Sequence, residues 1–221
     1  MPSTNRSDHL EQIGEYDSSA LFKPMVPALI VSKSEETGPN LMTASWWMLA
    51  GYDPFRYMLA VSEKSYTHEI IEANPEFVMA APSNELIEAL TLSGMVSGRD
   101  LDKIEHLDLE TVPGQSIDVP LLVEAVGNIE LSVMDSFSVE GITYFLAGVE
   151  NAYVTAGAMD GRLLSLDADI LAYMGSDWPE GEEAKSKHRY YAELSPEDLR
   201  SFPGDRVIES LPEELQARFV E

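Results

Sequence analysis

The chain has 221 residues, of which 44% are hydrophobic and 9% aromatic, and it contains no cysteine. This length and composition are those of one ordinary globular domain, and the lack of cysteine excludes disulfides, thiolate catalysis and cysteine metal sites. The formal net charge of −25 argues against nucleic acid or an anionic membrane as a partner, because both would be repelled.

No apolar run approaches the roughly 18 residues needed to span a bilayer, and the polar N-terminal sequence MPSTNRSDHLEQIGEYDSS shows no secretory signal. We therefore expect a cytoplasmic protein. The acidic residues are dispersed along the whole chain, as in halophilic proteins, where salt screens the repulsion between surface carboxylates. An acidic protein from a mesophile is the alternative to this halophilic interpretation.

The first half of the chain predicts short strands interrupted by two helices. β-Branched and apolar runs bounded by Gly and Pro indicate the strands Pro27 to Ser32, Leu41 to Met48, Tyr57 to Ser62 and Phe77 to Ala81. Apolar residues at helical spacing indicate the helices Thr67 to Ala73 and Asn84 to Leu92.

The second half predicts a helical turn in SGRDLDKIEHLDL, a loop from Val112 to Pro120, and then two long strands. These strands, Ala125 to Val139 and Ile142 to Val154, meet at Glu140-Gly141, which predicts a hairpin. Many strands with hairpin-length connections and few helices indicate a mainly β fold, an antiparallel barrel rather than a βαβ sheet.

The tail from Gly175 onward is charged and punctuated by proline, with helices expected at Pro196 to Ser201 and Pro212 to Phe219. It has too little apolar surface to fold alone. The sequence thus predicts an N-terminal arm at 1–23, one domain at 24–174 and an acidic extension at 175–221 that packs on the barrel.

Common nucleotide and hydrolase motifs are missing: there is no G-x-G-x-x-G, Walker A, H-E-x-x-H or G-x-S-x-G pattern. The histidines show no paired ligand spacing, so we predict no metal; they are His9, His68, His106 and His188. Redox chemistry in this chain would therefore require a bound organic cofactor.

The segment from Gly38 to Thr67 is rich in small and hydroxyl residues. A strand carrying Thr43, Ala44 and Ser45 lets a flat ring approach its main chain. The run SEKSYT, which begins at Ser62, leads into a helix whose first turn offers free N–H groups and a positive dipole end to a phosphate. This combination predicts a cradle for a flavin.

Together these residues resemble the flavin reductase-like family of FMN-binding split-barrel proteins, which includes flavoredoxins and the reductase components of two-component monooxygenases. The resemblance covers residues 24–154, with a weaker similarity at HRYYAEL, residues 188–194. It rests on the order of PNLMTASWW (39–47), Asp53-Pro54, SEKSYTHEII (62–71), SGRDLDKIEHL (97–107) and VPLLVEAVGNIEL (119–131). It implies an antiparallel, Greek-key split β-barrel with short inserted helices and a helical C-terminal tail.

The resemblance also implies the cofactor site, and several of its residues have a plain structural alternative. The strand residues that would follow the isoalloxazine ring are Asn40, Thr43, Ala44, Ser45 and Trp46. The phosphate residues would be Ser62, Lys64, Ser65 and Thr67. A second segment closing over the cofactor would comprise Ser97, Gly98, Asp102 and Lys103. The nicotinamide or acceptor side would be lined by His188, Arg189 and Tyr190.

The structural alternatives are strand packing for Trp46 and a turn position for Asn40. For Thr67 the alternative is a helix N-cap, and for Asp102 it is the cap of a helical turn. For Lys103 the alternative is a solvated charge. Residues 188–190 are alternatively part of a solvated tail.

By this resemblance the chain transfers hydride from NADH or NADPH to FMN, rather than FAD, with no catalytic side chain acting as acid or base. Electrons would pass to free flavin, a ferric complex, a partner oxygenase or another acceptor protein, and a homodimer would hold the flavin at its interface. An FMN-binding electron carrier without a nicotinamide site is the alternative. A split barrel that has lost its flavin is the third.

Overall fold

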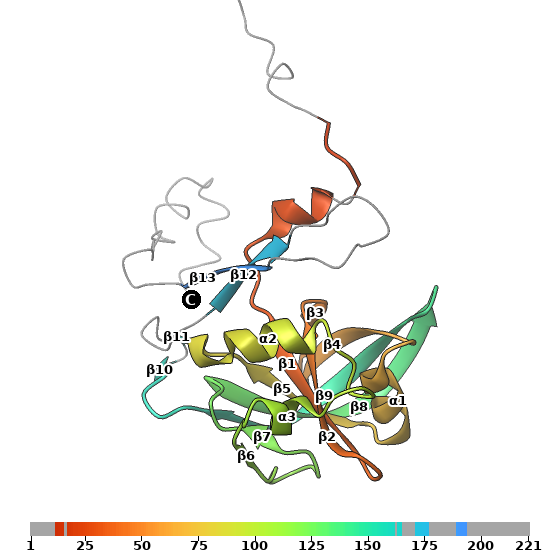
Figure 1. The fold of residues 1–221 in the computed structure, drawn as a ribbon, viewed down its shortest axis with the longest axis vertical. Coiled ribbons are helices and arrows are strands. Elements are labelled where there is room, and N and C mark those ends of the chain that lie inside the picture. Colours follow the sequence, from red (N-terminus) through yellow and green to blue (C-terminus); the bar gives the residue numbers. More distant parts are fainter. Residues whose placement is uncertain (1–11, 16, 162, 165–170, 177–188, 194–221) are drawn as a thin grey trace, which may run out of the picture.

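The computed structural model describes residues 12–15, 17–161, 163–164, 171–176 and 189–193 (Figure 1). Its centre is a seven-stranded antiparallel sheet with the strand order β2-β1-β5-β8-β9-β4-β3. The strands are β1 (Ala28–Ser34), β2 (Gly38–Ala44), β3 (Trp47–Tyr52), β4 (Phe55–Ser62), β5 (Glu76–Ala81), β8 (Gly127–Val139) and β9 (Ile142–Val154).

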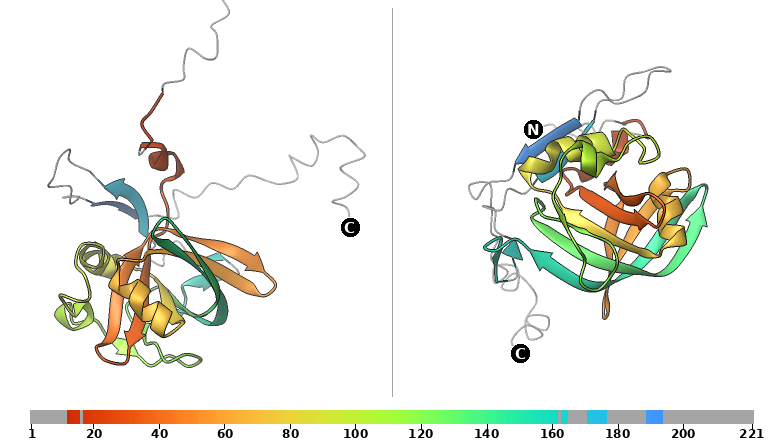
Figure 2. Two further views of the ribbon diagram at one scale, coloured as in Figure 1. Left: turned by 90° about the vertical axis from the view of Figure 1, so that its right-hand side faces the viewer. Right: turned by 60° about the horizontal axis from the view of Figure 1, so that its bottom comes forward.

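The two edge strands of this sheet, β2 and β3, are consecutive in the chain and are joined by Ser45 and Trp46. The carbonyl of Trp46 accepts a hydrogen bond from Ala60 N (2.9 Å), and the Trp47 indole donates to Val26 O (3.1 Å). The sheet therefore curls round until β3 lies near the start of β1, which makes a split β-barrel (Figure 2). The predicted mainly β fold is confirmed.

The single strand predicted from Leu41 to Met48 is wrong. The chain ends β2 at Ala44 and begins β3 at Trp47, because the same stretch must cross from one edge of the sheet to the other. Neither Gly nor Pro marks this break in the sequence, so the apolar pattern continues across it.

Alternating side chains on β1 separate two hydrophobic clusters. Ile30 points into the barrel, where it joins Phe77 and Phe145. Leu29 points outward, where it joins an outer cluster beneath η3 (Asn84–Leu86) and α2 (Ile87–Ser93). The predicted helix from Asn84 to Leu92 thus begins as a 3₁₀ turn.

Helix α1 (Tyr66–Ala73) joins the end of β4 to the start of β5 and packs on β1, β2 and β4. Its Ile71 belongs to the inner cluster, so α1 covers one end of the barrel. The remaining helices within the described ranges are η2 (Asp17–Phe22) and α3 (Lys103–His106). In the described part of the chain, no helix is long and apolar enough to cross a membrane.

Strands β8 and β9 form the predicted hairpin, whose turn residues Glu140 and Gly141 both have positive φ (48° and 82°). Such paired angles match the twist of a two-residue hairpin turn. The register of the pair shifts at Glu130/Leu131 and at Val133/Asp135. Such irregularities bend long strands, which suits their course round the barrel.

Short strands complete the described chain: β6 (Thr111–Val112), β7 (Leu121–Leu122), β10 (Met159–Asp160), β11 (Leu163–Leu164), β12 (Leu171–Ser176) and β13 (Arg189–Glu193). β6 and β7 flank the predicted loop and pair with each other. β12 and β13 also pair, and Tyr191 packs against the outer cluster. The tail helices predicted at 196–201 and 212–219 lie outside the described residues.

Candidate functional site

A polar cavity of about 70 Å³ lies where β2, the first turn of α1 and the loop at 97–103 meet. It is lined by Thr37, Pro39, Asn40, Tyr66, Gly98, Leu101, Asp102 and Lys103. Four of these lining residues were predicted as site residues, from two motifs far apart in the sequence. We call this cavity, with the adjoining turn from Ser62 to Thr67, the cradle.

Asn40 ties β2 to α1. Its side chain is buried, and its amide nitrogen donates to Thr67 Oγ1 (2.9 Å) and to Ser32 Oγ (3.2 Å). Asn40 also lies in the register of β2 opposite Ser32. The turn alternative for Asn40 is therefore wrong, and a polar strand residue fixes the start of α1 against the sheet.

Gly98 allows the loop at 97–103 to approach Asn40. A β-carbon at Gly98 would overlap Asn40 Oδ1 and would lie 3.0 Å from the Tyr66 ring. Only glycine leaves room for this contact, which explains the residue type at a position where the sequence alone shows just a Ser-Gly pair. The close approach closes one wall of the cradle.

Ser65 is the N-cap of α1, because its hydroxyl oxygen accepts from His68 N (3.1 Å). Thr67 lies inside the first turn and is buried, so the N-cap alternative for Thr67 is wrong. The preceding turn is closed by Ser65 N donating to Ser62 O (2.9 Å), and Lys64 is exposed on it. Among the described residues Lys64 makes no ion pair.

Arg99 brings a second cation to the start of α1, and sequence reasoning missed it. Its guanidinium pairs with Glu69 (2.6 Å), donates to Lys64 O (3.3 Å) and lies 5.1 Å from the centre of the Tyr66 ring. Ser97 Oγ accepts from Arg99 N (3.2 Å). The scarcity of basic residues in so acidic a chain was the available signal for a role of Arg99.

Asp102 and Lys103 are neighbours with different structural roles. Asp102 caps α3 by accepting from Ile104 N (3.0 Å) and Glu105 N (3.1 Å), as its structural alternative supposed. Lys103 is 3% exposed and donates to Val96 O (3.1 Å), so the solvated-charge alternative is wrong. Burial lowers the pKa of the Lys103 ammonium, and the neighbouring carboxylates of Asp102 and Asp100 oppose that shift.

The end of β2 offers less free polar surface than its sequence suggested. Thr43 donates its hydroxyl to Leu90 O of α2 (2.5 Å), and Ala44 is buried in the inner cluster. Ser45 is half-buried and Trp46 is 65% exposed, whereas Trp47 packs against the inner cluster. The two tryptophans thus alternate between solvent and core, as the structural alternative supposed, although Trp46 lies in the crossing between β2 and β3 and not within a strand.

Of the predicted nicotinamide or acceptor residues, Arg189 and Tyr190 do not line the cradle cavity. Arg189 donates to Gly94 O (3.1 Å) at the C-terminal end of α2, and Tyr190 is exposed on β13. His188 lies outside the described residues. Within the described ranges, no group of three or more His, Asp or Glu side chains is placed to hold a metal ion.

The chain matches the family model of the flavin reductase like domain over residues 24–177, and it belongs to this family. An uncharacterized protein of Pyrococcus abyssi is 30% identical over 160 residues, which cover 72% of this chain and 90% of that protein. An uncharacterized protein of Archaeoglobus fulgidus is 34% identical over 134 residues, or 61% and 73% of the two chains.

Solved structures share the fold. A flavoredoxin from Methanosarcina acetivorans has a TM-score of 0.72 at 19% identity, covering 88% of this chain and 95% of its own. An FMN-binding protein from Thermus thermophilus with bound 1-cyclohex-2-enone has a TM-score of 0.67 at 20% identity, covering 87% and 98%. At these identities the likeness establishes the split-barrel fold of the family.

Proposed function

We propose that this chain binds FMN and transfers hydride to it from NADH or NADPH, with electrons passing on to free flavin, a ferric complex or an acceptor protein such as a partner oxygenase. One observation carries the proposal. Asn40, Thr67, Gly98 and Lys103, which belong to three separate motifs of the family pattern, lie together beside the first turn of α1. Family membership and neighbours named as flavoredoxin and FMN-binding protein support it.

The turn before α1 fits a phosphate monoester. Ser62 and Ser65 supply hydroxyls, Lys64 supplies an exposed ammonium, and the first turn of α1 supplies N–H groups and the positive end of its dipole. The Ser65 hydroxyl accepts one hydrogen bond from His68 N, so its own hydrogen remains available for an anion. In a chain of net charge −25, this local arrangement offsets the general repulsion of anions.

The flavin ring is proposed to lie along the end of β2 and the crossing to β3, where Trp46 presents an exposed aromatic surface. FMN supplies the hydride chemistry when bound. The residues of this chain orient the phosphate and the ring and exclude water from one side. No side chain is required to act as an acid or base.

We propose that the flavin lies at the interface of a homodimer. Large apolar side chains are exposed on the crossing and the β3–β4 hairpin: Trp46, Met48, Tyr52 and Phe55. A partner chain covering this surface would shield both the apolar patch and the edge strand β3. Light scattering in molar KCl should give close to twice the monomer mass of 24.4 kDa, and a monomeric mass would contradict this proposal.

A protein that holds FMN and exchanges electrons without using a nicotinamide is the second candidate, favoured by the likeness to a flavoredoxin. Anaerobic addition of NADH or NADPH to the FMN-loaded protein separates the two. The reductase function predicts that the visible absorption of the flavin bleaches at a rate compatible with turnover. Bound flavin that stays oxidised with both nucleotides, but is reduced by dithionite, would favour the electron carrier.

A further inference from the structure

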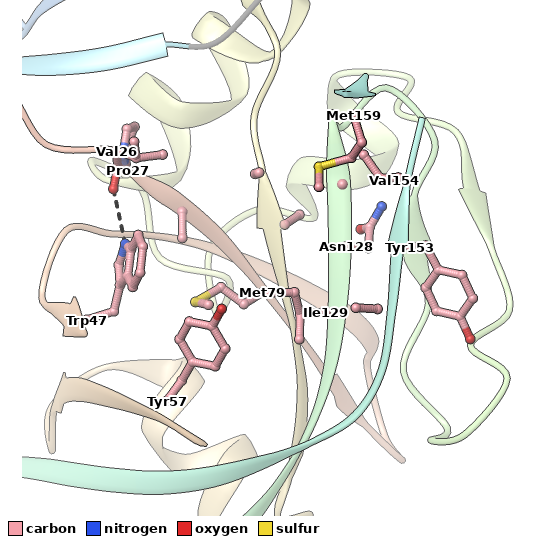
Figure 3. Close-up of a pocket in the computed structure, with 15 residues that line it drawn as sticks. Val26, Pro27, Trp47, Tyr57, Met79, Asn128, Ile129, Tyr153, Val154 and Met159 are labelled. Atoms are coloured by element: carbon pink, nitrogen blue, oxygen red, sulfur yellow. Dashed lines mark hydrogen bonds between the residues drawn. The ribbon is translucent and has the colours of Figure 1, made fainter. Parts of the chain in front are cut away.

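The end of the barrel opposite α1 opens into an apolar cavity of about 530 Å³ (Figure 3). Its rim is formed where β1 and β8 begin and where β5 and β9 end, at Ala28, Gly127, Ala81 and Val154. We call this cavity the mouth. The described linings of the mouth and of the cradle cavity have no residue in common.

None of the described residues that line the mouth is charged, although charged residues make up 24% of the chain. A charged ligand would lose its hydration there and find no counter-ion, which is costly in an apolar site. The mouth therefore suits a neutral occupant.

Small side chains leave the space open. Ala152 lies opposite Ile129 in the β8–β9 register, so both side chains point to the same face, and Ile129 packs against the inner cluster. Ala152 consequently faces the space above this cluster. The volume of the mouth falls within the roughly 300 to 1,000 Å³ of small-molecule sites.

Among the residues that the structure describes, four polar side chains line the mouth, and three of them are already paired. Trp47 Nε1 donates to Val26 O (3.1 Å), and the Asn128 amide bonds with Leu122 N (3.0 Å) and O (2.9 Å). Tyr153 donates to Glu130 (2.9 Å).

The fourth is Tyr57, whose hydroxyl has no hydrogen-bond partner among the described residues. Figure 3 shows the Tyr57 ring beside Met79, between the wall that carries Trp47 and the wall that carries Ile129. Burial raises the pKa of the Tyr57 phenol, so it remains a protonated donor at neutral pH. The described part of the mouth thus holds one unused donor, the Tyr57 hydroxyl, in apolar surroundings.

We propose that the mouth binds a neutral, ring-shaped organic molecule that carries one hydrogen-bond acceptor. This acceptor would take a hydrogen bond from the Tyr57 hydroxyl. The rings of Trp47 and Tyr57, with centroids 6.1 Å apart and planes at 53°, supply aromatic walls for such a molecule. The inference does not depend on flavin binding, because none of the residues proposed to hold the phosphate or the flavin ring is among the described residues that line the mouth.

The test is calorimetric titration of the full chain, with and without saturating FMN, using three probes of one ring system: 2-naphthol, naphthalene and 2-naphthoate. We expect 2-naphthol to bind in both conditions. Naphthalene should bind roughly fivefold more weakly, because it lacks one neutral hydrogen bond, and 2-naphthoate at least about tenfold more weakly because of its charge.

Two variants and a control locate the binding. Tyr57→Phe should abolish the preference for 2-naphthol over naphthalene while retaining the binding of both. Ala152→Leu fills the space above Ile129 and should weaken both by about tenfold or more. Tyr144→Phe, on the same barrel near the β8–β9 hairpin turn and stacked on Phe137, should change neither.

Absence of 2-naphthol binding, or equal binding of 2-naphthoate, would overturn the proposal. So would unchanged 2-naphthol affinity in Ala152→Leu or stoichiometric displacement of 2-naphthol by FMN, which would assign the mouth to the flavin. If wild type binds no probe and Ala152→Leu changes the mass by light scattering, the mouth is instead covered by a second copy of the chain.

Discussion

The two ends of the barrel differ in polarity. At the α1 end, Asn40, Thr67 and Gly98 are held by hydrogen bonds and a tight contact, and Lys64 and Arg99 provide cations beside them. At the other end, the described lining of the mouth carries no charge, and it includes the Tyr57 hydroxyl, which has no partner within the described ranges. In this strongly acidic chain, buried hydrogen bonds and cations therefore gather at the α1 end, where a phosphate is proposed, while the described lining of the mouth is mostly apolar.

Gly98→Ala should break the α1 end most severely. The added β-carbon would overlap Asn40 Oδ1, so the loop at 97–103 must move away from β2 and open the cradle. We expect FMN affinity to fall by roughly a hundredfold or more, which corresponds to the loss of about 2.8 kcal/mol or more of positioned contacts. Calorimetry or flavin fluorescence quenching measures this loss, and 2-naphthol binding should be unchanged.

Gly148→Ala is the matched control. A β-carbon there meets only the flexible Met134 side chain at 3.1 Å, which can shift. Its FMN affinity should stay within about twofold of wild type. Equal losses in both glycine variants would show that Gly98 has no special part in the cradle.

Ser65→Asp should weaken FMN binding next most strongly. Aspartate is also a good N-cap, so α1 is retained while a carboxylate replaces a donor beside the proposed phosphate position. The loss of one charge-assisted hydrogen bond costs about 1.5 to 3 kcal/mol, roughly ten- to a hundredfold in affinity, and repulsion adds to it. Riboflavin, which has no phosphate, should lose far less. If FMN and riboflavin weaken equally while the protein stays folded, the phosphate does not lie at Ser65, and the roles proposed for Lys64 and Thr67 fail with it.

Glu130→Gln should affect the mouth end and not the cradle. The fully buried Glu130 carboxylate accepts from Gln115 N (2.7 Å), Ser116 N (3.1 Å) and Tyr153 Oη (2.9 Å), and Tyr153 lines the mouth. The variant should lose about 1 to 3 kcal/mol of unfolding free energy, because a side-chain amide cannot accept all these bonds. FMN affinity should be unchanged, and a comparable loss of FMN affinity would contradict the separation of the two ends.

The stability difference between wild type and Glu130→Gln should depend on pH. Burial alone would raise the Glu130 pKa, but hydrogen bonds from Ser116, Tyr153 and Gln115 outweigh it, and the pKa is lowered. A lowered folded-state pKa contributes stability above the unfolded value, near 4.3, and loses it as pH falls through the folded value. Thermal melts should therefore show a constant difference above about pH 5.5 and a shrinking one below about pH 4.3. A difference that grows on acidification would contradict this assignment.

Salt should affect the whole acidic surface, so it distinguishes the two ends of the barrel least. Because dispersed carboxylates repel at low ionic strength, we expect Tm to rise as KCl increases well beyond ordinary buffer concentrations. A flat or falling Tm would remove the halophilic interpretation. Flavin binding could survive that outcome, since the two inferences rest on different residues.

Local patterns predicted the strands and the hairpin well, because alternation and turn residues are properties of a few neighbouring positions. The break at Ser45 and Trp46 could not be predicted, since no Gly or Pro marks it and its cause is the closing of the barrel. The choice of Ser65 over Thr67 as N-cap was open because both hydroxyls precede the same apolar face.

The candidate site was predicted as a set of motifs, and the structure brings part of that set together. The contacts of Asn40 with Thr67 and Gly98 join segments far apart in the sequence, so only the fold reveals them. The same is true of the mouth, whose Ala28, Ala81 and Ala152 are unremarkable small residues on three separate strands.

Calorimetric titration of the full chain with FMN, at low and at molar KCl, tests the central claim most directly. The account predicts a yellow complex with one FMN per chain, and affinity for FMN greater than for riboflavin because the phosphate meets the start of α1. No binding of FMN or FAD at either salt concentration would contradict it.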